Sequence, residues 1–181
     1  MSIPTPDAPD LDITVVVGNP KAHSRTWDAA HRLADGLGAS ASTSIDVVDL
    51  GPGLLGWGDP TVKAAVQRVA SSDVVVFASP TFKATYTGLL KLFLDQFDGG
   101  TGLRGVVVVP LMLGAGPVHA MAPEVFLRPV LAELGATIPA AALYLIDRTY
   151  TEDDRIDDYV GVWGPVLRLA TTLTQPEETL A

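Results

Sequence analysis

The chain has 181 residues, 48% of them hydrophobic, which suits one globular domain with a sizeable core and is short for two. Its formal net charge of -9 disfavours nucleic acid or an anionic membrane as a partner, because both need a basic face. The sequence contains no cysteine, which excludes disulfides and dithiol chemistry within it, so redox work would need a bound organic cofactor.

The amino-terminal segment MSIPTPDAPDLD is rich in proline and acid and lacks the basic and apolar regions of a secretory signal. We predict a disordered tail over residues 1–12, one domain over residues 13–174 and a carboxyl-terminal tail over residues 175–181. The most hydrophobic run, residues 106–113, is far shorter than the roughly 18 apolar residues that span a bilayer. We therefore expect a cytoplasmic protein with no membrane association.

Short β-branched runs alternate with amphipathic segments of helical length, a pattern typical of a parallel sheet covered by helices. The predicted strands are residues 13–18, 44–50, 73–78, 105–113 and 139–146. The predicted helices are residues 25–37, 61–70, 87–97, 120–134 and 153–173. This alternation predicts an α/β fold, a flavodoxin-like doubly wound five-stranded parallel sheet of order 2-1-3-4-5 with helices on both faces.

The helix predicted over residues 87–97 is unusually apolar. At the helical periodicity its apolar side chains cover an arc of about 200°. They are Leu89, Leu90, Leu92, Phe93, Leu94 and Phe97. So wide an arc favours a subunit contact in addition to a core contact, and we expect a homodimer or homotetramer. The alternative is a helix wedged more deeply than usual into its own domain.

The loop that follows the first predicted strand, GNPKAHSRT, carries donors that suit a phosphate. Ser24, Arg25 and Thr26 combine two hydroxyls, a guanidinium and the free N–H groups of a helix N-terminus. Ser24 could instead serve only as an N-cap, a common role for serine. His23 is expected to be a solvated bystander.

The loop that follows the third predicted strand is suited to a flat, anionic ligand. Pro80 stiffens the exit from the strand, Thr81 offers a hydroxyl, and Lys83 places a charge beside the aromatic face of Phe82. Ligands of open α/β sheets bind outside the carboxyl ends of the strands, where this loop is expected. The alternative is a polar connection that carries aromatic residues without a ligand.

The loop that follows the fourth predicted strand, LGAGPVHA, has Gly114 and Gly116 where a planar ligand could approach the backbone. It weakly matches the dinucleotide pattern G-x-G-x-x-G, with His119 in place of the last glycine. That fingerprint belongs after the first strand, so a glycine-rich turn is the alternative. The acids near the next helix, from Asp147 to Asp158, are expected to be solvated and not to bind metal.

Together, GNPKAHSRT, SPTFKATYTGLLKLFLD and LGAGPVHAMAPEVFLRPVLAELGA resemble the NAD(P)H-dependent FMN reductases, particularly those that supply reduced flavin to sulfonate monooxygenases. The resemblance covers most of residues 13–146, and the second segment is its specific part. The sequence departs from the family pattern at Asn19 and Lys21 in the first loop, and at Pro123, Val125 and Phe126 after the third.

The resemblance implies three groups of FMN-binding residues. Ser24, Arg25 and Thr26 would hold the phosphate; Pro80, Thr81, Phe82 and Lys83 would line the isoalloxazine; Gly114, Ala115, Gly116 and His119 would approach its polar edge. It also implies hydride transfer from NADPH or NADH to flavin N5 and a flavin-dependent monooxygenase as a partner. That chemistry requires no side-chain acid or base, so no catalytic side chain and no metal site is predicted.

Three alternatives stay open at this point. A quinone or azo reductase with tightly bound FMN would share the fold. A flavodoxin-like electron carrier would bind FMN without oxidising NAD(P)H, although its usual phosphate loop is richer in Thr and Gly. A flavin-free regulatory or interaction domain would bind no FMN at all.

Overall fold

The structure is a computed structural model that describes residues 11–39 and 42–174. Five strands form one sheet in the order β2-β1-β3-β4-β5, and every neighbouring pair is parallel. The strands are β1 (Ile13–Val17), β2 (Thr43–Asp46), β3 (Val74–Pro80), β4 (Val107–Gly114) and β5 (Leu143–Ile146). The predicted fold class and strand order are confirmed.

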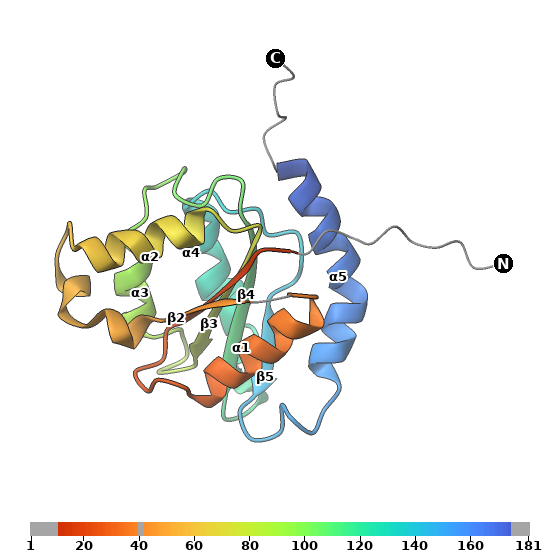
Figure 1. Ribbon diagram of the computed structural model, residues 1–181. Coiled ribbons are helices and arrows are strands. Elements are labelled where there is room, and N and C mark those ends of the chain that lie inside the picture. The colour runs from red at the N-terminus through yellow and green to blue at the C-terminus, as the bar shows by residue number, and fades with distance from the viewer. Residues whose placement is uncertain (1–10, 40–41, 175–181) are drawn as a thin grey trace, which may run out of the picture.

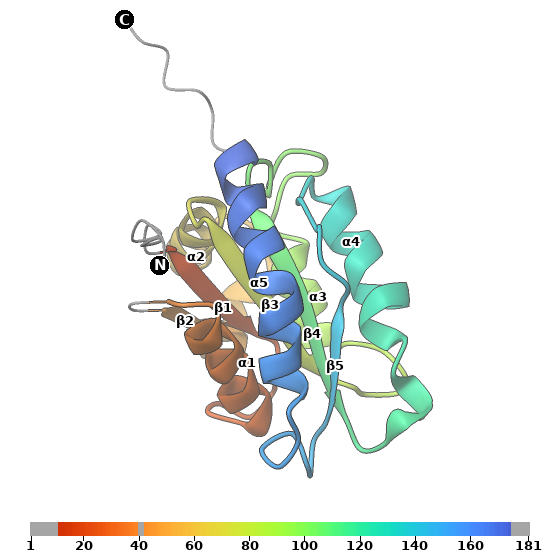
Figure 2. The ribbon, with the colours of Figure 1, turned by 90° about the vertical axis from the view of Figure 1, so that its right-hand side faces the viewer.

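Helices cover both faces of the sheet (Figures 1 and 2). They are α1 (Arg25–Gly36), α2 (Pro60–Ala70), α3 (Gly88–Leu94), α4 (Arg128–Glu133) and α5 (Arg155–Thr174). The side chains of α1 and α5 share one core cluster, and those of α2, α3 and α4 share the other. No helix among residues 11–39 and 42–174 is long and apolar enough to cross a membrane.

The central strands read as continuous hydrophobic runs because each contributes to both cores. Along β1, Val15 and Val17 face the α1 and α5 side, whereas Val16 faces the other cluster. All five residues of β1 are buried. Burial on both faces is usual for a parallel sheet and explains why these strands show no alternation of apolar and polar residues.

Several predicted elements differ from the structure. The fifth strand begins at Leu143, not at residue 139. The second strand ends at Asp46, not at residue 50, and residues Val47–Leu55 form 3-10 turns (η1) that kink at Gly51, whose φ is 55°. The helix predicted over residues 120–134 is divided into a π-helical turn η3 (Pro123–Leu127) and α4, and a 3-10 turn η2 (Pro117–His119) precedes it. Pro123 and Pro129 have no N–H to donate, so a regular helical ladder cannot run through them.

The apolar helix α3 is shorter than predicted and sits largely in its own domain. Leu90, Phe93, Leu94 and the following Phe97 are buried, so the core accounts for most of the predicted arc. Leu92 is 36% exposed. Only a narrow part of the helix is therefore available for a subunit contact.

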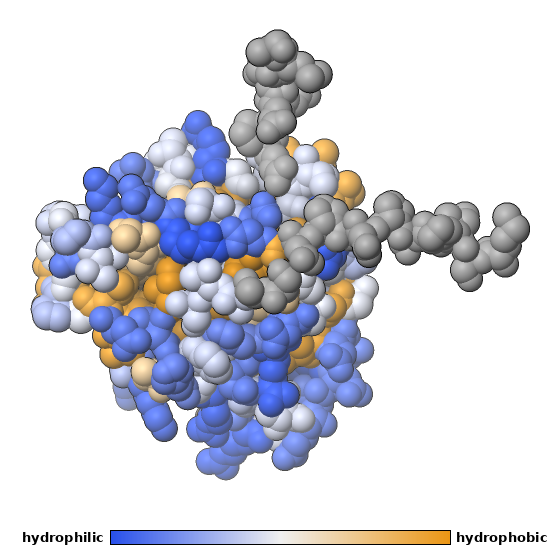
Figure 3. Space-filling model, in the orientation of Figure 1, coloured by the Kyte–Doolittle hydropathy of each residue, from blue (hydrophilic) through white to orange (hydrophobic). Residues whose placement is uncertain are grey.

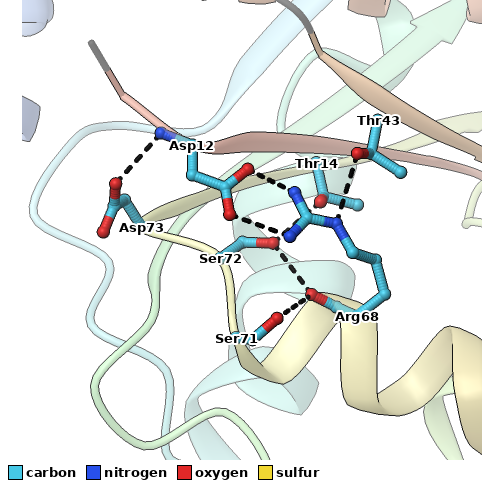
Figure 4. Close-up of polar contacts among 7 residues, drawn as sticks. All are labelled: Asp12, Thr14, Thr43, Arg68, Ser71, Ser72 and Asp73. Carbon is cyan, nitrogen blue, oxygen red and sulfur yellow. Dashed lines mark hydrogen bonds and ion pairs between the residues drawn. The ribbon is translucent and has the colours of Figure 1, made fainter.

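The amino ends of the strands are joined by a polar network (Figure 4). Arg68 of α2 donates from Nε to Thr43 Oγ1 at 3.2 Å and forms a two-point ion pair with Asp12. The backbone N–H of Asp12 donates to Asp73 Oδ2 at 3.0 Å. Asp12 belonged to the predicted tail, yet it and the buried Leu11 contact the domain; residues 1–10 and 175–181 lie outside the described residues.

Candidate functional site

A cavity of about 470 Å³ opens at the carboxyl ends of the strands, at the opposite end of the sheet from the network in Figure 4. Small-molecule sites commonly have volumes of roughly 300–1,000 Å³. The lining residues follow four different strands. They are Asn19, Lys21, His23, Ser24, Arg25, Thr26, Pro80, Thr81, Phe82, Leu113, Gly114, Ala115 and Asp147.

The strand register explains why these residues meet. Pro80 of β3 pairs with Leu113 of β4, and Gly114 pairs with Ile146 of β5. Because all strands are parallel, the segments that leave them emerge at one edge of the sheet. We name these segments the first loop (residues 18–24), second loop (81–87), third loop (115–122) and fourth loop (147–154).

The first loop presents a helix N-terminus to the cavity. Ser24 is the N-cap of α1, and its Oγ accepts the N–H of Trp27 at 3.3 Å. Ser24 therefore caps the helix, while its hydroxyl proton is free to rotate toward another acceptor; whether capping is its only role stays a prediction. Asn19 Nδ2 donates to Thr26 Oγ1 at 3.1 Å, which ties the two ends of the loop together. The first N–H groups of the helix have no intrahelical acceptor and can bind an anion.

The backbone of the first loop is held in an uncommon conformation. His23 has a φ of 48°, in the left-handed region, and its N–H donates to Asp46 Oδ2 at 3.1 Å. Its ring makes an edge contact with the Trp27 ring at 5.3 Å. His23 is exposed at the cavity wall, so its expected role as a solvated bystander stays a prediction. Asp46, at the end of β2, keeps the loop in register with the sheet.

The second loop contains a tight turn. Phe82 and Thr85 exchange two backbone hydrogen bonds, and the residues between them, Lys83 and Ala84, have φ values of 52° and 71°. Left-handed conformations cost energy for residues with a Cβ and occur frequently at functional sites. The turn leaves Phe82 51% exposed at the cavity wall.

The ends of the second loop are tied to its neighbours. Thr87, the N-cap of α3, donates its hydroxyl to the carbonyl oxygen of Gly18 at 2.6 Å. The N–H of Thr87 donates to Ser79 Oγ at 3.1 Å, and the N–H of Thr81 donates to Leu113 O at 2.6 Å. These hydrogen bonds therefore connect the second loop to the first loop and to β4.

Tyr144 supports the third loop from below. Its hydroxyl donates to Gly116 O at 2.7 Å, and burial raises the pKa of Tyr144, which favours the protonated donor. A Cβ added at Gly114 would lie 1.9 Å from this hydroxyl, so no side chain fits at that position. Glycine is required at position 114 because the Tyr144 hydroxyl packs against its Cα. The backbone of Gly114 lines the cavity.

The structure brings together most of the predicted site. Ser24, Arg25, Thr26, Pro80, Thr81, Phe82, Gly114 and Ala115 line one cavity. Lys83, Gly116 and His119 do not line it; His119 lies instead with Val118, Met121 and Phe126 around a separate apolar hollow. These three residues lie in turns, and the spacing of residues along the sequence does not predict which way the side chains of a turn point.

Asp147 is a site residue that we did not predict. It follows β5 directly, and its Oδ2 lies 3.0 Å from Arg25 Nη2 while its carbonyl oxygen accepts from Arg25 Nη1 at 3.3 Å. We expected it to belong to a solvated acidic cluster. Its place immediately after a strand end was the available signal, because every cavity loop begins there.

The donor set fits a ligand with a phosphate at one end and a flat ring at the other. Hydroxyls, a guanidinium and helix N–H groups meet where the first loop enters α1, whereas Phe82, Leu113 and Gly114 form a largely apolar wall. An open doubly wound sheet with such a cavity at its carboxyl edge defines the flavodoxin-like class of proteins.

Comparison with known proteins narrows this class. The sequence profile of the family "NADPH-dependent FMN reductase" matches residues 11–151, so the chain belongs to that family. An FMN reductase (NADPH) of Escherichia coli strain K12 is 31% identical over 100 residues, which are 55% of this chain and 49% of that protein. The matched part thus spans about half the length of that relative.

Two further relatives match over greater lengths. The NADH-dependent FMN reductase SfnF of Pseudomonas putida is 31% identical over 139 residues, covering 71% of this chain and 74% of its own. The crystal structure of an apo NADH:FMN oxidoreductase (EMOB) superposes with a TM-score of 0.77 and 27% identity, covering 93% of this chain and 92% of the other. The predicted family is confirmed, and the predicted enzyme class, NAD(P)H:FMN oxidoreductase, is the class of these relatives.

Proposed function

We propose that the protein is an NAD(P)H-dependent FMN reductase that binds FMN in the cavity at the carboxyl edge of the sheet. The observation that carries the proposal is the meeting, in one cavity, of the N-terminus of α1 with Ser24 and Arg25 and of an apolar wall that includes Leu113 and Gly114 at the end of β4. FMN combines a phosphate with a flat ring and so matches both ends. Membership of the FMN reductase family supports the same ligand.

The roles of the residues follow from their chemistry. Ser24, Arg25 and the first N–H groups of α1 would bind the phosphate through charge-assisted hydrogen bonds. Pro80, Phe82 and the backbone at Gly114 would hold the ring and exclude water from one side of it. FMN, when bound, supplies the atom that accepts hydride, so the chain need only bind and orient it.

Lys83 and His119 lie outside the cavity wall, on the second and third loops. We keep them, with Gly116, as proposed contacts of the ring edge or of the incoming nicotinamide dinucleotide. A flavin-dependent monooxygenase that consumes the reduced FMN is the proposed partner. Use of NAD(P)H fits the proposed cytoplasmic location.

Oxidation of NADPH and NADH by the purified protein, with and without added FMN, tests the proposal. We expect oxidation of at least one nicotinamide to depend on added FMN. A protein that copurifies yellow and needs a quinone or azo compound as acceptor would be a reductase of the alternative type. Bound FMN without NAD(P)H consumption would indicate an electron carrier, and no FMN binding in a titration would refute flavin chemistry altogether.

A further inference from the structure

Among the described residues, Asp147 is the one acid in a cavity wall that otherwise carries neutral and basic groups. Its Oδ2 and its carbonyl oxygen both contact the guanidinium of Arg25, and its N–H donates to Gly114 O at 2.9 Å. Asp147 therefore connects the proposed phosphate end of the cavity, at Arg25, with the proposed ring end, at Gly114.

The second carboxylate oxygen of Asp147 has no hydrogen-bond partner. Oδ1 is shielded from solvent, and no donor of the described residues reaches it. An unsatisfied buried acceptor of this kind is costly, and native sites commonly satisfy it with a ligand or ordered water. Since Arg25 already contacts Oδ2, Oδ1 is the oxygen of this cavity-lining side chain that still lacks a donor.

The charge of the carboxylate restricts what that donor can be. A phosphate oxygen would be repelled by Asp147, and the apolar edge of a flavin ring would leave Oδ1 unsatisfied. The ring N3–H could also donate, and lumiflavin, which keeps that N–H but lacks the hydroxyls, distinguishes this case. A hydroxyl group can donate to a carboxylate without bringing negative charge. In FMN, hydroxyls occur on the ribityl chain, which connects the phosphate to the ring just as Asp147 connects Arg25 to Gly114.

We propose that Asp147 is a specificity residue whose Oδ1 accepts a hydroxyl of the ligand's polyol chain while Oδ2 orients Arg25 toward the phosphate. This inference rests on the proposed binding of FMN, and it assigns the middle of the ligand to a residue of the fourth loop. It also explains why an acid is compatible with an anion-binding cavity, since the carboxylate lies beside the neutral part of the ligand.

Flavins that differ only in their side chain test the proposal. Riboflavin has the hydroxyls but no phosphate, and lumiflavin carries a methyl group in place of the whole chain. Titrations followed by flavin fluorescence should show that Asp147→Ala weakens riboflavin about tenfold, as for the loss of a hydrogen bond to a charged group, and leaves lumiflavin unchanged. Asp147→Asn should have a smaller effect, because its amide oxygen still accepts.

Asp98→Ala is the matched control, because Asp98 is an exposed acid in the turn after α3, outside the cavity wall. It should leave the affinities for all three flavins unchanged. Unchanged riboflavin affinity in Asp147→Ala would overturn the proposal, and so would an equal loss for riboflavin and lumiflavin. Tighter FMN with unchanged riboflavin would show instead that Asp147 competes with phosphate for Arg25. If the wild-type protein bound none of the flavins, the proposed function itself would fall.

Discussion

Arg25 is the residue on which the proposed phosphate site chiefly depends. Its side chain is 61% exposed and is held by Asp147 through the ion pair at 3.0 Å. An exposed ion pair contributes little to stability, typically about 0–1 kcal/mol. We therefore interpret the ion pair as a contact that orients the Arg25 guanidinium at the cavity and contributes little to folding stability.

Arg25→Ala should weaken FMN binding by roughly 1.5–3 kcal/mol, the loss expected for a hydrogen bond between charged groups. Riboflavin, which has no phosphate, should bind almost as before. Fluorescence titrations with both flavins measure the difference. Arg104→Ala serves as the control, because Arg104 is exposed and lies before β4, at the other end of the sheet. Equal FMN affinity in the wild type and Arg25→Ala would remove Arg25 from the phosphate site.

At the scale of elements, the cavity depends on contacts between loops more than on any single loop. Thr87 caps α3 and also holds Gly18 of the first loop by its hydroxyl. At Gly18 an added Cβ would lie 2.4 Å from Leu90 Cβ, so the first loop packs directly on α3. The proposed phosphate end and the proposed ring end of the cavity are thus positioned by one helix.

Gly18→Ala should therefore force the first loop and α3 apart. Overpacking of this kind costs roughly 1–3 kcal/mol of folding stability, and FMN affinity should fall with it. Chemical denaturation and flavin titration measure the two effects. Gly88→Ala is the matched control, because an added Cβ there meets nothing within 4 Å. If Gly18→Ala were as stable as Gly88→Ala and bound FMN equally well, the proposed packing constraint would be incorrect.

For the whole molecule, the open question is the subunit contact that we predicted from the apolar helix. The exposed apolar side chains on and next to this helix are Leu55, Trp57 and Leu92, which are 76%, 78% and 36% exposed. They line a shallow hollow between η1 and α3, held in place by the hydrogen bond from Gln96 Nε2 to Gly56 O at 3.2 Å. Hydrophobic surface is visible on the side of the molecule where η1, α2 and α3 lie (Figures 1 and 3).

We expect this hollow to be covered by a second copy of the chain, since contiguous exposed apolar surface commonly marks an interface. Light scattering coupled to size exclusion should then show a dimer or tetramer, and Trp57→Glu combined with Leu92→Glu should shift it to the monomer. Val162→Glu is a suitable control, because Val162 is 63% exposed on α5, in the other helical layer. A wild-type monomer at micromolar concentration would contradict the prediction.

The sequence was sufficient to predict the strand order and most of the residues of the cavity wall. Buried parallel strands are continuous β-branched runs, and the residues that follow them must meet at one edge of the sheet. Ser24, Thr81 and Gly114 could therefore be assigned to one site from their positions after strands. The family resemblance added the expected ligand, and the family profile match agrees with it.

Other features depended on the tertiary structure. The direction of Lys83 and His119 is set by a left-handed turn and a 3-10 turn, which no periodicity encodes. Asp147 belongs to the cavity because β5 pairs beside β4 and brings it against Arg25, which is 122 positions away in the chain. Hydrophobic patterning determines which segments are buried, but the contacts between loops depend on packing distances that are settled only when the sheet is assembled.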